Sequence, residues 1–212
     1  MPSTLPILVC VVAVVGLLAA EKSGSRPGVW LTKPVAAGAY VWSAVSWGAL
    51  ETSYGRWLLV ALVLCLWGDV LLIPKSRRMW FRAGIIAFLA GHLAYIVAFL
   101  HLPIGLTGLV AGILAAAALA WAVVTWLGPR LPGGFRRLVM IYIAVICFML
   151  VAAFATADGS GRWAIALGGS LFALSDISVA RDRFVAKGFV NRAWGLPLYF
   201  AAQLILASTA AG

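Results

Sequence analysis

The sequence predicts an all-α membrane protein, a single helical bundle with eight transmembrane helices. Hydrophobic residues make up 64% of the 212 residues and charged residues 10%, whereas soluble domains carry roughly 25% charged residues. The apolar residues fall into eight runs long enough to cross a bilayer. These runs cover about residues 5–20, 31–50, 57–73, 83–101, 104–127, 138–157, 163–180 and 194–211. They leave no room for a soluble domain, so residues 1–212 are expected to form one membrane domain.

The first two apolar runs are both expected to form helices of the mature protein. Residues 5–20 resemble a signal peptide, because Leu18-Ala19-Ala20 is similar to a small-residue cleavage site. No Lys or Arg precedes this run, however, and signal peptides start with basic residues. We therefore expect a retained helix. The run over 31–50 has Lys33 and Pro34 in its first turn, where proline is tolerated.

The later runs carry packing and boundary signals. The run over 104–127 has small residues at intervals of four, which let a second helix approach closely: Gly108, Gly112, Ala116 and Ala120. Pro197 is expected in the first turn of the run over 194–211. Tryptophans lie near the ends of six runs, as in an interfacial aromatic belt: Trp30, Trp57, Trp80, Trp126, Trp163 and Trp194.

Basic residues lie on one side of the predicted membrane. Alternate loops hold thirteen of the sixteen Lys and Arg residues: Lys22, Arg26, Lys75, Arg77, Arg78, Arg82, Arg130, Arg136, Arg137, Arg181, Arg183, Lys187 and Arg192. The positive-inside rule places these loops in the cytoplasm and both termini on the non-cytoplasmic side. We expect a multi-pass protein of the inner, cytoplasmic membrane. Topology and anionic lipid headgroups explain the net charge of +10, so no nucleic acid partner is expected.

Two aspartates lie inside apolar runs. Asp69 is expected four residues before the cytoplasmic end of its helix, about 6 Å deep, and Asp176 at the same depth in the run over 163–180. The other four acids fall in or beside predicted loops. A carboxylate at membrane depth costs at least a few kcal/mol and therefore indicates a function. These two residues are the centre of the predicted site.

Further polar side chains are predicted at similar depth, and together with the two aspartates they come from five helices. They are Lys33, Tyr40, His92, Tyr95, Tyr199 and Gln203, with Asn191 and Arg192 just before the last helix. In lipid these groups must face the interior of the bundle, so they are expected to form a pocket open to the inner leaflet or the cytoplasm. The alternative is a set of interhelical hydrogen bonds that only holds the bundle together.

Two buried carboxyls suit proton-transfer chemistry. Burial favours the protonated form of a carboxyl, and two that share a site separate their protonation equilibria. One then acts as a general acid and the other as a general base. Lys33 and loop arginines are positioned to receive a phosphate at the cytoplasmic mouth. The two histidines make a poor zinc site, and we find no G-x-S-x-G motif or Gly-rich phosphate loop, so no metal or cofactor is expected.

Five segments in order resemble the YhhN family of membrane proteins. They are Thr32-Lys33-Pro34, Gly68-Asp69-Val70-Leu71-Leu72-Ile73-Pro74, Gly91-His92-Leu93-Ala94-Tyr95, Gly169 to Asp176, and Tyr199-Phe200-Ala201-Ala202-Gln203. The resemblance runs from about residue 30 to the C-terminus. It implies an eight-helix lysoplasmalogenase, which cleaves the vinyl ether bond of a lysophospholipid into a fatty aldehyde and a glycerophospho-headgroup.

The family pattern maps onto Lys33, Asp69, His92, Tyr95, Ser175, Asp176, Tyr199 and Gln203. The chemistry of a vinyl ether and the predicted positions of the polar residues then suggest their roles. Asp69 and Asp176 are the expected catalytic acid and base, without an assignment of which is the acid, and Tyr199 and His92 orient them or the attacking water. Substrate binding is expected to involve Lys33, Tyr40, Tyr95, Ser175, Asn191, Arg192 and Gln203. The competing hypothesis is a small transporter whose buried aspartates bind a proton or cation. A noncatalytic scaffold would leave both acids without a purpose.

Overall fold

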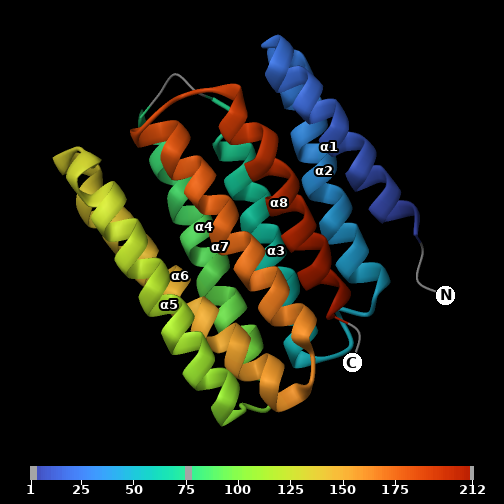
Figure 1. Ribbon diagram of the computed structural model, residues 1–212. Coiled ribbons are helices and arrows are strands. Elements are labelled where there is room, and N and C mark those ends of the chain that lie inside the picture. Colours follow the sequence, from blue (N-terminus) through green and yellow to red (C-terminus); the bar gives the residue numbers. More distant parts are fainter. Residues whose placement is uncertain (1–3, 75–77, 211–212) are drawn as a thin grey trace.

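The computed structural model describes residues 4–74 and 78–210, which form eight α-helices and one 3-10 turn without a β-strand (Figure 1). The elements are α1 (Leu5–Ser23), α2 (Arg26–Ser46), α3 (Ser53–Leu71), α4 (Arg78–Phe99), α5 (Leu106–Leu127), η1 (Gly128–Arg130), α6 (Gly133–Ser160), α7 (Trp163–Phe184) and α8 (Phe189–Ser208). The prediction of an all-helical bundle is confirmed for this part of the chain. Lys75 and Arg77, which the sequence assigned to a basic loop, lie outside the described residues.

Local capping determines where several helices begin and end. The Ser25 side chain accepts a hydrogen bond from the Gly28 amide at the start of α2, and Thr52 does the same for the Gly55 amide in α3. These bonds satisfy amides that have no partner within the helix. The helices α1 and α6 are each followed by a glycine with positive φ, Gly24 and Gly161, as is common where a helix stops.

The structure corrects several helix boundaries. Helix α2 begins at Arg26 and ends at Ser46, so Lys33 lies two turns inside the helix and not in its first turn. Helix α8 begins at Phe189, which places Asn191 and Arg192 in its first turn and Pro197 in its interior. Helix α7 continues to Phe184, so Asp176 is deeper along its helix than Asp69, which lies two residues before the end of α3.

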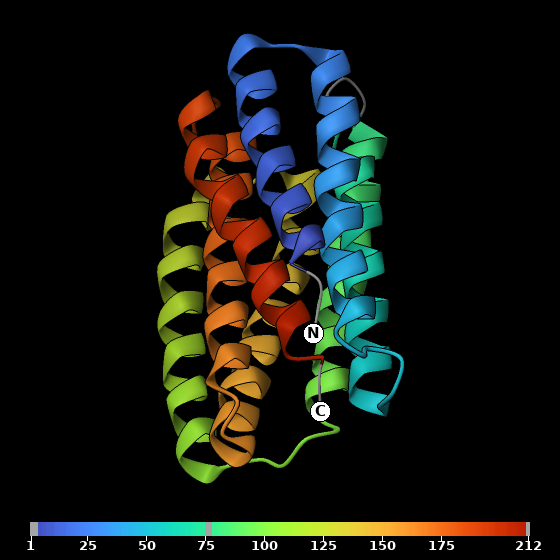
Figure 2. The ribbon, with the colours of Figure 1, turned by 90° about the vertical axis from the view of Figure 1, so that its right-hand side faces the viewer.

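The helices form a bundle with two distinct edges. Figure 1 shows α5 and α6 along one edge, α1 and α2 along the other, and the remaining four helices between them, and in Figure 2 the α1–α2 edge faces the viewer. The predicted close approach of α5 is confirmed, because a Cβ atom added to Gly108 would lie 2.2 Å from the Phe154 carbonyl oxygen of α6. Asp158 of α6 also accepts a hydrogen bond from the Gly108 amide at 2.9 Å, which satisfies an amide in the first turn of α5.

Six of the described helical segments are long and apolar enough to cross a membrane. Helices α2 and α8 have sufficient length, 21 and 20 residues, but are not among these six. Both carry several of the predicted site residues, which lowers their mean hydropathy. A helix that directs polar groups into a protein interior does not need to be apolar throughout.

The residues expected to face the cytoplasm gather at one end of the bundle. The α1–α2, α5–α6 and α7–α8 connections lie at the upper end in Figure 1. The guanidinium carbons of Arg78 and Arg82 in α4 lie 5.0 and 5.1 Å from the ring centre of Phe135 in α6. Arg183 of α7 lies 4.3 Å from the ring centre of Phe81 in α4. Cation–π contacts therefore join helix ends at this side of the molecule.

Candidate active site

A cavity of about 540 Å³ opens among the helices, and each of the eight described helices contributes to its wall. Asp69, Asp176 and Tyr199 lie on this wall. Apart from Tyr142, the part of the wall formed by α5 and α6 is apolar and includes Leu119, Val123, Leu127, Ile143 and Ile146. The cavity thus joins a pair of carboxyl groups to a space that suits a hydrocarbon chain.

Asp69 accepts hydrogen bonds from three side chains on two other helices. The Lys33 Nζ lies 3.1 Å from Asp69 Oδ1 and also 3.1 Å from the Asp69 carbonyl oxygen. Tyr199 donates to Asp69 Oδ2 at 2.6 Å, and Tyr40 donates to the same oxygen at 3.2 Å. The carboxyl group is 3% exposed. All these partners are donors, which is the environment of an ionised carboxylate.

The contacts of Lys33 and Tyr40 bear on their predicted roles in substrate binding. Lys33 is buried and serves as the counter-ion of Asp69, so its charge does not lie free at the mouth of the cavity. Tyr40 is fully buried, lies 3.2 Å from the Tyr199 hydroxyl oxygen and is not part of the cavity wall. In this structure both residues hold the Asp69 side chain in place.

Asp176 has a separate network. Tyr142 of α6 donates a hydrogen bond to Asp176 Oδ2 at 3.1 Å. The His92 Nε2 of α4 lies 3.4 Å from the same oxygen, within ion-pair distance but without hydrogen-bond geometry. This carboxyl group is 15% exposed, compared with 3% for that of Asp69, and it also lies on the cavity wall.

Aromatic rings separate the two networks. The ring of Phe172 packs 4.4 Å from the His92 ring centre on one side and 5.5 Å from that of Tyr199 on the other. Phe88 lies 5.8 Å from Tyr199 and 6.4 Å from Phe172. No hydrogen bond in the described residues joins Asp69 to Asp176. The two carboxyl groups face one cavity, and each has its own set of partners.

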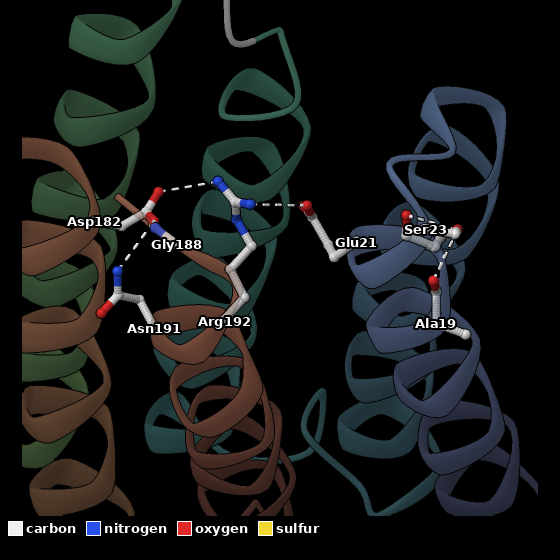
Figure 3. A network of polar contacts seen from close by, with 8 residues as sticks. Ala19, Glu21, Ser23, Asp182, Gly188, Asn191 and Arg192 are labelled. Carbon is white, nitrogen blue, oxygen red and sulfur yellow. Dashed lines mark hydrogen bonds and ion pairs between the residues drawn. The ribbon is translucent and has the colours of Figure 1, made fainter. Parts of the chain in front are cut away.

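An ion-pair network lies at the mouth of the cavity (Figure 3). Arg192 contacts Asp182 of α7 at 3.0 Å and Glu21 of α1 at 3.3 Å. Asn191 donates to Asp182 Oδ1 at 3.1 Å and to the Ala186 carbonyl at 2.6 Å, and it accepts from Arg181. Arg192 was predicted to bind substrate, but here it already lies between two carboxylates. These contacts tie the ends of α1, α7 and α8 together.

The remaining predicted residues have different surroundings. Ser175 lies on the cavity wall, but its hydroxyl donates to the Phe172 carbonyl at 2.7 Å. Tyr95 donates to Gln203 Oε1 at 2.5 Å, and both side chains are fully buried away from the cavity wall. This pair matches the alternative of an interhelical hydrogen bond, and a role in substrate binding remains a prediction.

Sequence reasoning missed Tyr142, Glu21 and Asp182. Tyr142 lies in an apolar run in which a single tyrosine gives little signal, although its helix position faces Asp176. Glu21 and Asp182 were taken as residues in or beside loops, whereas both lie in the last turn of a helix and on the cavity wall. Their position beside Arg192 required knowledge of how α1, α7 and α8 meet.

The arrangement supplies two elements of acid–base chemistry. A carboxylate surrounded by donors, as Asp69 is, can stabilise a positive charge that develops nearby. A carboxyl group on the cavity wall with an imidazole and a phenol beside it, as Asp176 is, can exchange a proton with a molecule in the cavity. Among the described residues, no group of three or more His, Cys, Asp or Glu side chains is placed to bind a metal ion.

Comparison with known proteins points to one family. The sequence model of the YhhN family matches residues 28–210. The chain is 34% identical over 160 residues to a Bos taurus protein named lysoplasmalogenase TMEM86A. The aligned region covers 72% of this chain and 64% of that protein. The chain is 32% identical over 162 residues to a Mycobacterium bovis protein named lysoplasmalogenase, and this aligned region covers 71% of the present chain and 59% of the relative. The matched region thus spans less than two thirds of these relatives. No solved structure matches.

Proposed function

Because the chain belongs to the YhhN family, we propose that it hydrolyses the vinyl ether bond of a lysoplasmalogen or a related single-chain lysophospholipid. The relatives named lysoplasmalogenase support this activity. The observation that carries the proposal is the placement of Asp69 and Asp176 on the wall of one largely apolar cavity. A lipid with one chain can place its hydrocarbon against α5 and α6 and its ether bond near the carboxyls.

The chemistry of a vinyl ether matches these two groups. Proton delivery to the β-carbon creates an oxocarbenium ion, water adds to its α-carbon, and the hemiacetal collapses to an aldehyde and an alcohol. A proton donor and a carboxylate that stabilises the cation and activates water meet this need. Asp69 and Asp176 share these roles, Tyr199 and Tyr40 hold Asp69, and His92 and Tyr142 hold Asp176.

The cavity mouth is the proposed site for the phosphate headgroup. Its wall includes Lys187 and Arg183 as well as the Arg192 network with Glu21 and Asp182. Asn191 and Arg192 then shape this mouth, with Arg192 neutralised in part by its carboxylate partners. We place the cavity mouth in the cytoplasmic half of the bilayer. In this topology all eight helices span an inner membrane, and both termini lie outside.

Purified protein tests the activity with three lysolipids that differ only at the first chain linkage. We expect mass spectrometry to detect fatty aldehyde from the vinyl ether lipid and no cleavage of the saturated alkyl ether. Saturation removes the double bond that accepts the proton. The acyl lysolipid reports on ester hydrolysis. Cleavage of the acyl lipid alone, or of none of the three by a monodisperse preparation, would contradict the proposal. Proton-coupled uptake in sealed vesicles would then support a transporter.

A further inference from the structure

The hydrogen bonds of His92 fix where one of its protons lies. The His92 Nδ1 lies 2.7 Å from the Phe88 carbonyl oxygen, one helical turn earlier in α4. A carbonyl oxygen only accepts hydrogen bonds, so Nδ1 must carry a hydrogen. A neutral imidazole with its hydrogen on Nδ1 has an unprotonated Nε2, which is an acceptor.

That Nε2 faces an acceptor. It lies 3.4 Å from Asp176 Oδ2, is fully buried and has no hydrogen-bond partner among the described residues. With His92 neutral and Asp176 ionised, two lone pairs would face each other without water between them. An unpaired acceptor and an uncompensated negative charge are both costly inside a membrane protein.

We propose that His92 and Asp176 share one additional proton between Nε2 and Oδ2, and that this proton is the one delivered to substrate. With it, the pair is either a neutral imidazole and carboxylic acid or an imidazolium and carboxylate, and its net charge is zero in both cases. Tyr142 donates to the same oxygen and steadies it. No Lys or Arg ion pair of Asp176 occurs within 4.0 Å in the described part of the chain.

Asp69 provides the contrast that assigns the two roles. Its carboxyl receives Lys33, Tyr199 and Tyr40, each of which brings its own hydrogen. With Lys33 protonated, the Lys33–Asp69 pair is neutral when Asp69 is ionised. The Asp69 network therefore has no transferable proton on its carboxyl, and Asp69 is the carboxylate that faces the developing cation.

The assignment rests on the proposed vinyl ether activity and gives a balanced reaction. The shared proton moves from the His92–Asp176 pair to the β-carbon, and the double-bond electrons form the new C–H bond. Water adds to the α-carbon and releases a proton toward Asp69. Collapse of the hemiacetal moves its hydroxyl proton to the departing glycerol oxygen. The proton accepted at Asp69 balances the one lost, and its return to the pair through water restores the resting state.

Nitrogen-15 NMR of labelled histidine detects the shared proton through the chemical shift of His92 Nε2, and it needs no substrate. His101→Gln removes the only other histidine in the sequence, which is exposed just after the last residue of α4, Phe99. We expect the His92 Nε2 signal to be that of a protonated or strongly hydrogen-bonded nitrogen at neutral pH. Asp176→Leu, which supplies neither a proton nor a hydrogen bond, should move it to that of a neutral ring with a bare Nε2, and Asp69→Asn should leave it unchanged. A bare Nε2 in the protein with Asp176 intact would overturn the inference.

Kinetics tests the delivery of that proton. His92→Phe keeps an aromatic ring and removes the shared proton site, so kcat for aldehyde release should fall by about 100-fold or more. KM should stay within about threefold, because His92 does not line the cavity. The control is His101→Phe. If the NMR signals are as expected but neither the unmodified protein nor any variant releases aldehyde, the proposed function is rejected. If His92→Phe leaves kcat unaffected, the role given to the His92–Asp176 pair is rejected.

Discussion

At the scale of single residues, the site depends on how each buried charge is neutralised. Lys33 and Asp69 form an ion pair that is almost fully buried. Removing one member of a buried pair leaves an uncompensated charge, whereas removing both can be nearly neutral for stability. The two networks can therefore be separated by substitution.

Lys33→Met should lower the free energy of unfolding by about 3–5 kcal/mol, because Asp69 would remain buried without its counter-ion. The double variant Lys33→Met, Asp69→Leu should regain most of that stability and show no aldehyde release. Thermal unfolding in detergent micelles measures the first effect, and mass spectrometry the second. Equal instability of the single and double variants would show that the ion pair is not the cause.

Residue-level prediction from the sequence succeeded where charge contrasts with its surroundings. Asp69 and Asp176 are conspicuous because they interrupt apolar runs, and the structure places both on the cavity wall. Tyr142 is not conspicuous, because tyrosine is tolerated in apolar helices and its contact with Asp176 comes from another helix. The difference between the two aspartates also could not be predicted, since it depends on which helices pack beside each.

At the scale of helices, apolar runs marked the number of helices but not their ends. A run of apolar residues indicates what faces lipid, whereas capping and backbone hydrogen bonds decide where a helix starts. Ser25 caps α2, which starts at Arg26, five residues before the predicted run at 31–50, and α8 starts at Phe189 directly after Gly188. These shifts moved Lys33 deeper into α2, and its Nζ lies beside Asp69.

The contact between α5 and α6 gives a prediction at this scale. A Cβ atom at Gly112 would lie 2.9 Å from the Val151 Cα, so Gly112→Val should destabilise the protein by about 1–3 kcal/mol through overpacking. Ala118→Val on the exposed face of the same helix is the control, and its unfolding temperature should remain close to that of the unmodified protein. Equal unfolding temperatures for both variants would contradict this packing.

At the scale of the whole molecule, the basic helix ends and the cavity mouth lie at the same end of the bundle. Glu21, Asp182 and Arg192 join three helices there (Figure 3). The positive-inside rule assigns this end to the cytoplasm. The site is thus proposed to receive lipid from the inner leaflet, and this orientation can be tested independently of activity.

Cysteine labelling in sealed inverted membrane vesicles tests the orientation. In a background with Cys10, Cys65 and Cys147 replaced by alanine, an impermeant thiol reagent added outside should label Lys187→Cys. It should not label Glu51→Cys, which is exposed in the α2–α3 connection. Intact spheroplasts should give the reverse pattern. If both positions are labelled from the same side of the membrane, the predicted topology is contradicted.

The central claim is that both carboxyl groups on the cavity wall drive cleavage of a vinyl ether. The most direct measurement compares aldehyde release by Asp69→Asn, Asp176→Asn and the control Asp158→Asn, whose side chain caps α5 away from the cavity wall. We expect losses of about 100-fold or more for the first two variants and activity close to that of the unmodified protein for the third. Full activity in correctly folded Asp69→Asn or Asp176→Asn would contradict the central claim.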